Sequence, residues 1–467
     1  MFQSVRIGFA TNSSSSHSVV FHPGPKSALI NSVEETPIES MDYSERYVFT
    51  STRDKALFIL RSGGGGFQSN HSRLDVSRIL EKHGLPQSII DEALALDLPI
   101  ESGGMEMYHR FEESGITLPI WLDFMLSDQV IMYGYNDNYE DPLFPFLIRG
   151  HGVELAWGDV WRRDGDALVG FDQSSGTKVR WSRNPYDKST TPELVDLKIT
   201  DYCGYGCKFC YQGSTTEGMH APLARIEDIL DQLSAMNIFE LAIGGGEPAH
   251  HPEFADIIRA ATKRDITANF TSYGIDWLKN EDILDAIKES KGCGVGISVH
   301  SKRDLVKLQR VRDTIKDQRI WALQAMAQTV VGATPFATMD ALMDECISQQ
   351  LPLLLLGYKT TGRGADYGCR DVSDDKMRKL LRKAQAAIHG KDYGVSQGFH
   401  LSVDTAFLDR YAHILDELEI PKALRTSPEG HFSMYVDAVT ETCGPSSYCE
   451  TEQMEPIGNI KAQFANW

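Results

Sequence analysis

The chain has 467 residues, of which 42% are hydrophobic and 24% are charged, so it is long enough for two or three globular domains and too apolar for a disordered chain. Its net charge of −19 argues against nucleic acid or an anionic membrane surface as the main partner, because such binding needs clustered cationic side chains. The longest apolar run, 351–356, is far shorter than the roughly 20 residues of a membrane-spanning helix.

The first part of the chain, 1–190, predicts an N-terminal α+β domain. Apolar spacing indicates short helices at 74–82 and 89–96, and β-rich runs indicate strands at 5–9, 130–133, 168–171 and 178–181. The polar, proline-containing segment 184–192 predicts a linker. We expect this domain to recognise a substrate or a partner.

Two polar segments of this domain have alternative interpretations. The serine-rich segment 11–17 is interpreted as a flexible terminus or a turn, with a binding segment as the alternative. The acidic segment 136–141 is interpreted as a solvated loop, with a cation site as the alternative.

From residue 193 onwards, β-rich runs alternate with helical stretches, which is the pattern of parallel strands joined by crossover helices. The expected strands lie at 194–199, 240–243, 267–271 and 295–299, within 320–331, and at 353–358. The expected helices lie at 225–236, 253–263, 281–289, 302–317 and 339–349. These repeats predict a partial (β/α)6 barrel over 191–370, with its catalytic loops at the C-terminal ends of the strands.

The first loop of this expected barrel contains a cysteine triplet. Cys203, Cys207 and Cys210 form a C-x3-C-x2-C pattern, and soft thiolates at such spacing select zinc or iron–sulfur. No fourth Cys or His lies at zinc-finger spacing, since His220 is ten residues further on, but a structural zinc loop stays the alternative. In a four-iron cluster, three cysteines leave one iron open to a substrate or a cofactor. The apolar runs are too short to cross a bilayer and the first residues show no signal pattern, so we expect a cytoplasmic protein, for which eight cysteines are ordinary.

One strand after the triplet comes a second motif, Gly244, Gly245, Gly246, Glu247 and Pro248. With these two motifs, the segment of about 193–365 resembles the radical S-adenosylmethionine (SAM) superfamily. The resemblance implies a radical SAM barrel and a [4Fe-4S] cluster bound by the three cysteines. It also implies that the open iron binds the amino and carboxylate groups of SAM. Reductive cleavage of SAM then gives a 5′-deoxyadenosyl radical that abstracts hydrogen from a substrate.

The resemblance further implies which residues contact SAM. Phe209, directly before the third cysteine, is similar to an aromatic residue that packs near the adenine, and Tyr211, directly after it, is expected beside it. Backbone groups of 244–247 are expected to meet the ammonium group of SAM, because absent side chains permit a close approach. The adjacent histidines 250–251 are interpreted as loop residues and not as metal ligands.

Three further SAM contacts are expected at strand ends. Ser298, which ends the fourth strand, resembles the serine that contacts the ribose, and a buried core hydroxyl is its alternative. Ser272 ends the third strand, where the family often has Thr-Asn-Gly, so this match is imperfect. Tyr358, which ends the sixth strand, is expected to offer backbone groups to the adenine.

The remaining segment, 371–467, is expected to be a short C-terminal extension with a helix at 374–389 and strands at 398–404 and 432–436. Its end resembles the start of SPASM or twitch extensions, which bind auxiliary clusters in peptide-modifying members. Gln463 stands where the final cysteine of that pattern belongs. A second cluster would need Cys369, Cys443 and Cys449 plus a ligand other than cysteine, so we expect a shortened remnant and no second cluster.

The main functional hypothesis is a radical SAM enzyme that modifies a peptide or protein. A small, perhaps nucleotide-derived metabolite is the alternative substrate, and a cluster-binding sensor or scaffold without turnover is the alternative function. The resemblance implies an electron donor such as flavodoxin or ferredoxin. Neither nucleic acid nor a membrane is an expected partner.

Overall fold

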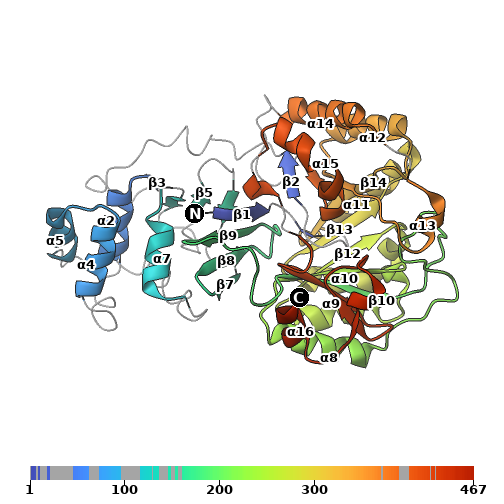
Figure 1. Ribbon diagram of the computed structural model, residues 1–467, viewed down its shortest axis with the longest axis horizontal. Coiled ribbons are helices and arrows are strands. Elements are labelled where there is room, and N and C mark those ends of the chain that lie inside the picture. Colours follow the sequence, from blue (N-terminus) through green and yellow to red (C-terminus); the bar gives the residue numbers. More distant parts are fainter. Residues whose placement is uncertain are drawn as a thin grey trace.

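The structure is a computed structural model that describes residues 2–6, 9–10, 18–21, 46–62, 73–95, 116–128, 130–135, 146–148, 153–155, 160–369, 372–388, 399–420, 422–425 and 428–467. The segments 11–17 and 136–141, for which the sequence left alternatives open, lie outside these residues. Figure 1 shows a large α/β body that contains the C-terminus, with N-terminal helices and smaller sheets extending to one side of it.

One eleven-stranded sheet organises the large body, in the order β19-β18-β17-β10-β11-β12-β13-β14-β15-β16-β2. Eight of the described strands are parallel neighbours: β17 (Ser433–Asp437), β10 (Leu194–Thr200), β11 (Glu240–Gly245), β12 (Thr267–Ser272), β13 (Cys293–Ser298), β14 (Leu323–Val330), β15 (Leu353–Leu356) and β16 (Leu401–Val403). The antiparallel strands β18 (Thr442–Gly444), β19 (Glu455–Pro456) and β2 (Ser18–Phe21) lie at the two edges.

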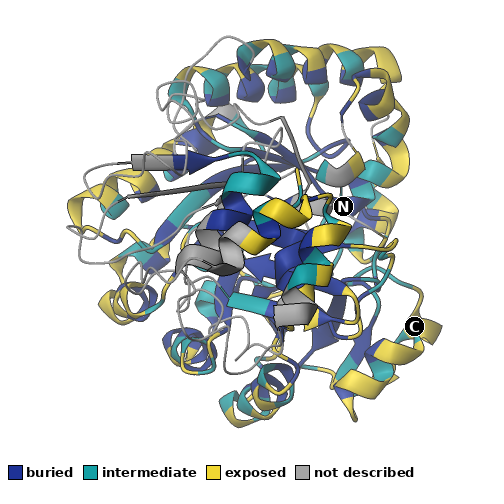
Figure 2. Ribbon diagram, turned by 90° about the vertical axis from the view of Figure 1, so that its left-hand side faces the viewer, coloured by how far each residue is buried: buried dark blue, intermediate teal, exposed yellow. Residues whose placement is uncertain are grey.

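Helices connect these strands and cover the outside of the sheet (Figures 1 and 2). They are α8 (Leu223–Ser234), α9 (Phe254–Thr262), α10 (Glu281–Glu289), α11 (Leu305–Asp317), α12 (Phe336–Gln349), α14 (Asp374–Ile388) and α15 (Thr405–Glu417), with the short α13 (Arg363–Tyr367). A further short helix, α16 (Ile460–Asn466), follows the last strand. Each long helix buries one apolar stripe: in α9, Phe254, Ile257, Ile258 and Ala261 recur at helical spacing and face the core. These helices therefore cover the outer face of the sheet, and the inner face of the sheet surrounds the interior of the large body.

The parallel α/β architecture predicted from the sequence is confirmed, because all six expected strands and all five expected helices of the barrel are present. Expected helix 302–317 begins with a 3-10 turn, η4 (Lys302–Asp304), before α11. The structure adds β17 beside β10 and β16 beside β15, and both come from the segment 371–467. This segment thus contributes strands to the same sheet as the expected barrel, while the division of the chain into domains stays a prediction.

Two four-stranded antiparallel sheets precede the large one. The first contains β1 (Phe2–Arg6), β9 (Lys178–Ser182), β8 (Ala167–Phe171) and β7 (Val160–Asp164). The second contains β3 (Arg46–Phe49), β4 (Val130–Tyr135), β5 (Phe146–Ile148) and β6 (Val153–Leu155). The accompanying helices are α2 (Thr52–Ser62), α4 (Arg73–Lys82), α5 (Gln87–Ala95) and α7 (Leu118–Met125). The expected helices at 74–82 and 89–96 are present, whereas β1 spans 2–6 and overlaps the strand expected at 5–9 at only two residues.

A buried ion-pair network joins the first small sheet to the N-terminal ends of the parallel strands. Glu193 accepts hydrogen bonds from Arg180 Nε at 2.6 Å and Nη2 at 2.8 Å, and Lys178 Nζ lies 2.8 Å from the same carboxylate. Glu240, at the start of β11, pairs with Arg6 at 2.5 Å. Burial alone would raise the pKa of Glu193, but the two cations hold it well below its usual value. This sheet is therefore anchored at the end of the barrel opposite the strands' carboxyl ends.

None of the helices in the described part of the chain has the length and apolar character needed to span a bilayer.

Candidate functional site

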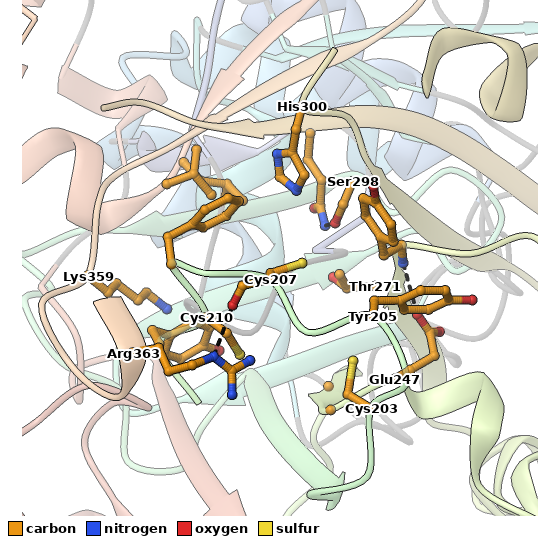
Figure 3. A pocket seen from close by; sticks show the side chains of 18 of the residues that line it. Cys203, Tyr205, Cys207, Cys210, Glu247, Thr271, Ser298, His300, Lys359 and Arg363 are labelled. Atoms are coloured by element: carbon orange, nitrogen blue, oxygen red, sulfur yellow. Dashed lines mark hydrogen bonds between the residues drawn. The ribbon is translucent and has the colours of Figure 1, made fainter. Parts of the chain in front are cut away.

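The carboxyl ends of the parallel strands surround a cavity with about 1000 Å³ of empty space, part of it open to solvent (Figure 3). Its lining comes from β10 to β16 and the loops that follow them, and comprises Cys203, Tyr205, Cys207, Phe209, Cys210, Tyr211, Gly244, Gly245, Gly246, Glu247, Thr271, Tyr273, Ser298, His300, Gln328, Val330, Leu356, Gly357, Tyr358, Lys359, Arg363 and Asp404. This is the edge of the sheet where the α/β architecture predicts catalytic loops. It brings together all of the expected site residues except Ser272.

The three cysteines of the triplet line this cavity as free, half-buried thiols. Burial and the neighbouring thiols raise the pKa of Cys207 to about 11, which a bound metal would reverse by favouring the thiolate. Within the described residues, no three Cys, His, Asp or Glu side chains converge as the ligands of a single metal ion. In a four-iron cluster each thiolate binds a different iron, so the ligands of the cluster lie further apart than the ligands of a single metal ion. Three thiols of one loop, all facing a cavity, fit that donor set.

Glycines at the end of β11 allow the backbone of the cysteine loop to approach closely. Gly246 N–H donates to Thr200 O at 2.7 Å, and Glu247 N–H donates to Tyr202 O at 2.9 Å. A Cβ on Gly246 would lie 2.0 Å from Tyr202 O, and one on Gly245, whose φ is +109°, would lie 2.3 Å from Thr200 O. The glycine run therefore holds the strand end against the residue that precedes Cys203, in addition to its expected role at SAM.

We expect Gly246→Ala to lower the iron bound after reconstitution and to lower the thermal midpoint. The added methyl group must displace the Tyr202 carbonyl, and with it Cys203, and overpacking of this kind costs about 1–3 kcal/mol. The matched control is Gly204→Ala, whose Cβ would meet only the His250 ring at 3.8 Å. Equal iron content in the two variants would contradict this role for Gly246.

The Glu247 carboxylate connects the ends of β11 and β12. It accepts hydrogen bonds from Ser272 Oγ at 2.7 Å and from Tyr273 N–H at 3.0 Å. Burial raises the pKa of Glu247 to about 6 despite these bonds. Ser272 is itself buried and lies outside the cavity lining, so the structure places it as a partner of Glu247.

The wall formed by β13 and β14 combines a polar pair with aromatic rings. Ser298 Oγ accepts a hydrogen bond from Gln328 Nε2 at 3.2 Å, and Gln328 Oε1, buried in the wall, has no protein partner among the described residues. His300 packs edge-on against Phe209, with ring centroids 4.8 Å apart, and stacks on Tyr273. Burial lowers the pKa of His300 to about 4, so this ring is neutral near pH 7.

The lining residues that the sequence analysis did not name include His300, Gln328 and Arg363. His300 and Gln328 lie within two residues of the end of a parallel strand, and that position was the available signal, whereas Arg363 begins α13, seven residues after the end of β15. The segment that follows β15 also contacts the cysteine loop: Arg363 donates to carbonyls of the loop, and Tyr358 O–H, in the same segment, donates to Gly364 O at 2.7 Å.

The two histidines after the glycine run differ in their contacts. His251 Nε2 donates to Ala221 O at 2.9 Å, and its Nδ1 accepts from Glu253 N–H at 3.1 Å. The His250 ring packs against Tyr205 with centroids 5.4 Å apart. Both nitrogens of His251 are thus engaged with backbone, as expected of a loop residue.

The remaining cysteines near the C-terminus lie in different environments. Cys443 is completely buried in the hydrophobic core, and Cys369 is exposed. Cys449 Sγ lies 3.6 Å from Met454 Sδ and lines a second cavity. The expectation that these residues bind no second cluster stays a prediction.

Comparison with known proteins identifies the class to which the site belongs. Residues 197–332 match the family model described as Radical SAM superfamily, so this segment, which carries the cysteine triplet and the glycine run, belongs to the radical SAM superfamily. That family uses a [4Fe-4S] cluster and SAM, and the resemblance inferred from the sequence is confirmed. The likeness of the C-terminal end to SPASM extensions stays a prediction.

The relatives it matches include mycofactocin maturases MftC. That of Mycobacterium ulcerans (strain Agy99) is 25% identical over 150 residues, which are 31% of this chain and 38% of the relative. That of Mycobacterium tuberculosis (strain ATCC 25618 / H37Rv) is 30% identical over 88 residues, or 18% of this chain and 22% of the relative. The chain thus spans 38% or less of the length of these curated relatives.

Similar solved structures include Streptococcus suis SuiB bound to S-adenosylmethionine, at 15% identity and a TM-score of 0.41 over 56% of this chain and 61% of that one. Another is anSMEcpe with bound AdoMet and the Cp18Cys peptide, at 13% identity and a TM-score of 0.42 over 58% of this chain and 80% of that one.

Proposed function

We propose that this protein is a radical SAM enzyme whose reaction takes place in the cavity at the carboxyl ends of β10 to β16. The observation that carries the proposal is that Cys203, Cys207 and Cys210, in a radical SAM segment, present three free thiols to that one cavity. When bound there, a [4Fe-4S] cluster and SAM supply a 5′-deoxyadenosyl radical able to abstract hydrogen from an unreactive C–H bond.

The chain's own residues bind, orient and shield the reactants. The three cysteines hold the cluster, and the backbone of 244–246 approaches the cavity without side chains in the way. Ser298 and Gln328 together offer a hydroxyl donor and a free carbonyl acceptor to a polar ligand. Phe209 and neighbouring rings form an apolar wall that excludes water from a radical.

A peptide is the substrate that we propose, and a second cavity supports it. This cavity has about 1020 Å³ of empty space and is lined in part by Thr405 and Tyr448. It lies against the first one: Thr405 follows Asp404, which lines the first cavity, and the Tyr448 ring centroid is 4.7 Å from Lys359 Nζ, another lining residue of the first. We propose that a peptide occupies both cavities, with its reacting residue in the first. The relatives' name, maturase, agrees with a substrate of this kind.

The proposed setting is the cytoplasm, with flavodoxin or ferredoxin as the electron donor. All eight cysteines are free, as is usual in a reducing compartment. The proposed chemistry needs a reductant strong enough to reduce an iron–sulfur cluster.

The test is an anaerobic assay of 5′-deoxyadenosine with reconstituted protein, dithionite, SAM and a low-molecular-weight cell extract. We expect the extract to stimulate 5′-deoxyadenosine formation, and protease treatment of the extract to remove the stimulation. Stimulation that survives the protease would point to a small metabolite instead. No 5′-deoxyadenosine above the level of a Cys203→Ala/Cys207→Ala/Cys210→Ala variant would favour a sensor or scaffold and contradict the proposed enzyme.

A further inference from the structure

A single arginine at the start of α13, in the segment that follows β15, binds the cysteine loop. Arg363 Nε donates to Cys207 O at 3.0 Å, and Arg363 Nη1 lies 2.9 Å from Gly213 O and 2.8 Å from Ser214 O. Its backbone N–H donates to Cys210 O at 2.9 Å. One residue, about 150 positions away along the chain, thereby contacts both ends of the loop that carries the second and third cysteines.

The local backbone places this arginine where it is. Gly362 has φ of +52°, a left-handed conformation that favours glycine, and a Cβ there would lie 2.4 Å from Tyr211 O. Thr361 Oγ1 also donates to Tyr211 O, at 3.2 Å. The turn that starts α13 therefore packs directly on the backbone next to Cys210, and Figure 3 shows the guanidinium beside Cys207 and Cys210.

The charge of Arg363 has no carboxylate partner in the described part of the chain, since every hydrogen bond recorded for its side chain ends on a backbone carbonyl. A half-buried cation without a counter-ion is unfavourable unless an anion comes close. Three thiolates bound to a four-iron cluster are such an anion, and one-electron reduction adds a further negative charge. Net charge and nearby hydrogen bonds are known to set the reduction potential of such clusters.

We propose that Arg363 is a positioning residue of the cluster site: its planar fork fixes the cysteine loop in the shape that binds iron, and its charge stabilises the reduced cluster. The inference rests on the proposed function in that it presupposes the cluster. It assigns no contact with SAM. A lysine keeps the charge but cannot reproduce the fork, so the two parts of the role can be separated.

The test uses the full chain, reconstituted anaerobically without SAM, as wild type, Arg363→Gln, Arg363→Lys and Arg259→Gln. The last variant removes the same charge from the outer surface of α9, where Arg259 pairs with Asp282 and Glu289. Iron per chain is measured chemically. The ratio of reduced to oxidised cluster is measured by electron paramagnetic resonance at one poised potential, with the electron supplied by dithionite through mediators.

We expect Arg363→Gln to lower that ratio about tenfold, equivalent to about 59 mV for a one-electron couple, and to bind less iron. Arg363→Lys should bind less iron than wild type but keep the ratio within about threefold, because the charge remains. Arg259→Gln should match the wild type in both measurements.

The proposal would be overturned if Arg363→Gln, without SAM, bound as much iron as the wild type and had the same ratio of reduced to oxidised cluster. Weaker SAM binding by that variant would not rescue the proposal, because Arg363 would then act on SAM alone. If Arg363→Gln does not fold, Arg363→Lys decides: reduced iron retention supports the positioning role, and wild-type retention refutes it. Neither measurement needs a substrate, so failure here is distinct from an absence of 5′-deoxyadenosine in the wild type.

Discussion

Replacing any one of Cys203, Cys207 and Cys210 by alanine is expected to reduce the reconstituted iron from about four per chain to a small residue, and to abolish 5′-deoxyadenosine formation. The three thiols line one cavity, and two ligands leave a second iron of the cluster open and labile. The measurements are iron and sulfide analysis, the visible absorption of the cluster, and chromatography of the nucleoside product.

The control for this experiment is Cys369→Ser, which alters an exposed cysteine that does not line the cavity. We expect it to keep the wild-type iron content of about four per chain, because the protein is expected to carry one cluster. About eight iron in the wild type, falling in Cys369→Ser, would show a second cluster and contradict that expectation. Zinc in place of iron at the triplet would contradict the proposed function itself.

The second large effect is on stability: Glu193→Ala should lower the free energy of unfolding by about 3–5 kcal/mol. The substitution removes the carboxylate that Arg180 and Lys178 share and leaves both cations buried without it. Because the pKa of Glu193 is held below its unfolded value, its contribution is complete above pH of about 4.3 and is lost as pH falls further. Urea unfolding of wild type and Glu193→Ala at neutral pH measures the difference in the free energy of unfolding. The same measurement in acid should give a smaller difference.

Glu289→Ala provides the matched control, since it removes a carboxylate from an exposed ion pair with Arg259. Such pairs contribute about 0–1 kcal/mol, so a loss at Glu289 equal to that at Glu193 would contradict the importance of burial.

The buried ion pairs of Glu193 and Glu240 also affect how the N-terminal region can be tested. Deleting 1–190 would remove Arg6, Lys178 and Arg180 and leave the buried carboxylates of Glu193 and Glu240 without their cationic partners. Substrate recognition by this region is therefore better tested with point variants.

The sequence alone determined the parts of this protein that depend on local pattern. The alternation of apolar strands and amphipathic helices specified a parallel α/β architecture, because crossover connections make neighbours of consecutive strands. The spacing of Cys203, Cys207 and Cys210 within one loop indicated their shared site, since residues so close in sequence meet in almost any fold of that loop.

Only the tertiary structure decided which distant residues join them. Arg363 and Gln328 carry no spacing signal, and they reach the cavity because the carboxyl ends of parallel strands meet at one edge of the sheet. Other contacts of the same kind are the pairing of β16 and β17 with the sheet, the hydrogen bond from Ser272 to Glu247, and the ion pairs of Glu193. Each of them joins residues on different elements of the chain. Such contacts depend on the packing of the whole chain, and no local periodicity encodes them.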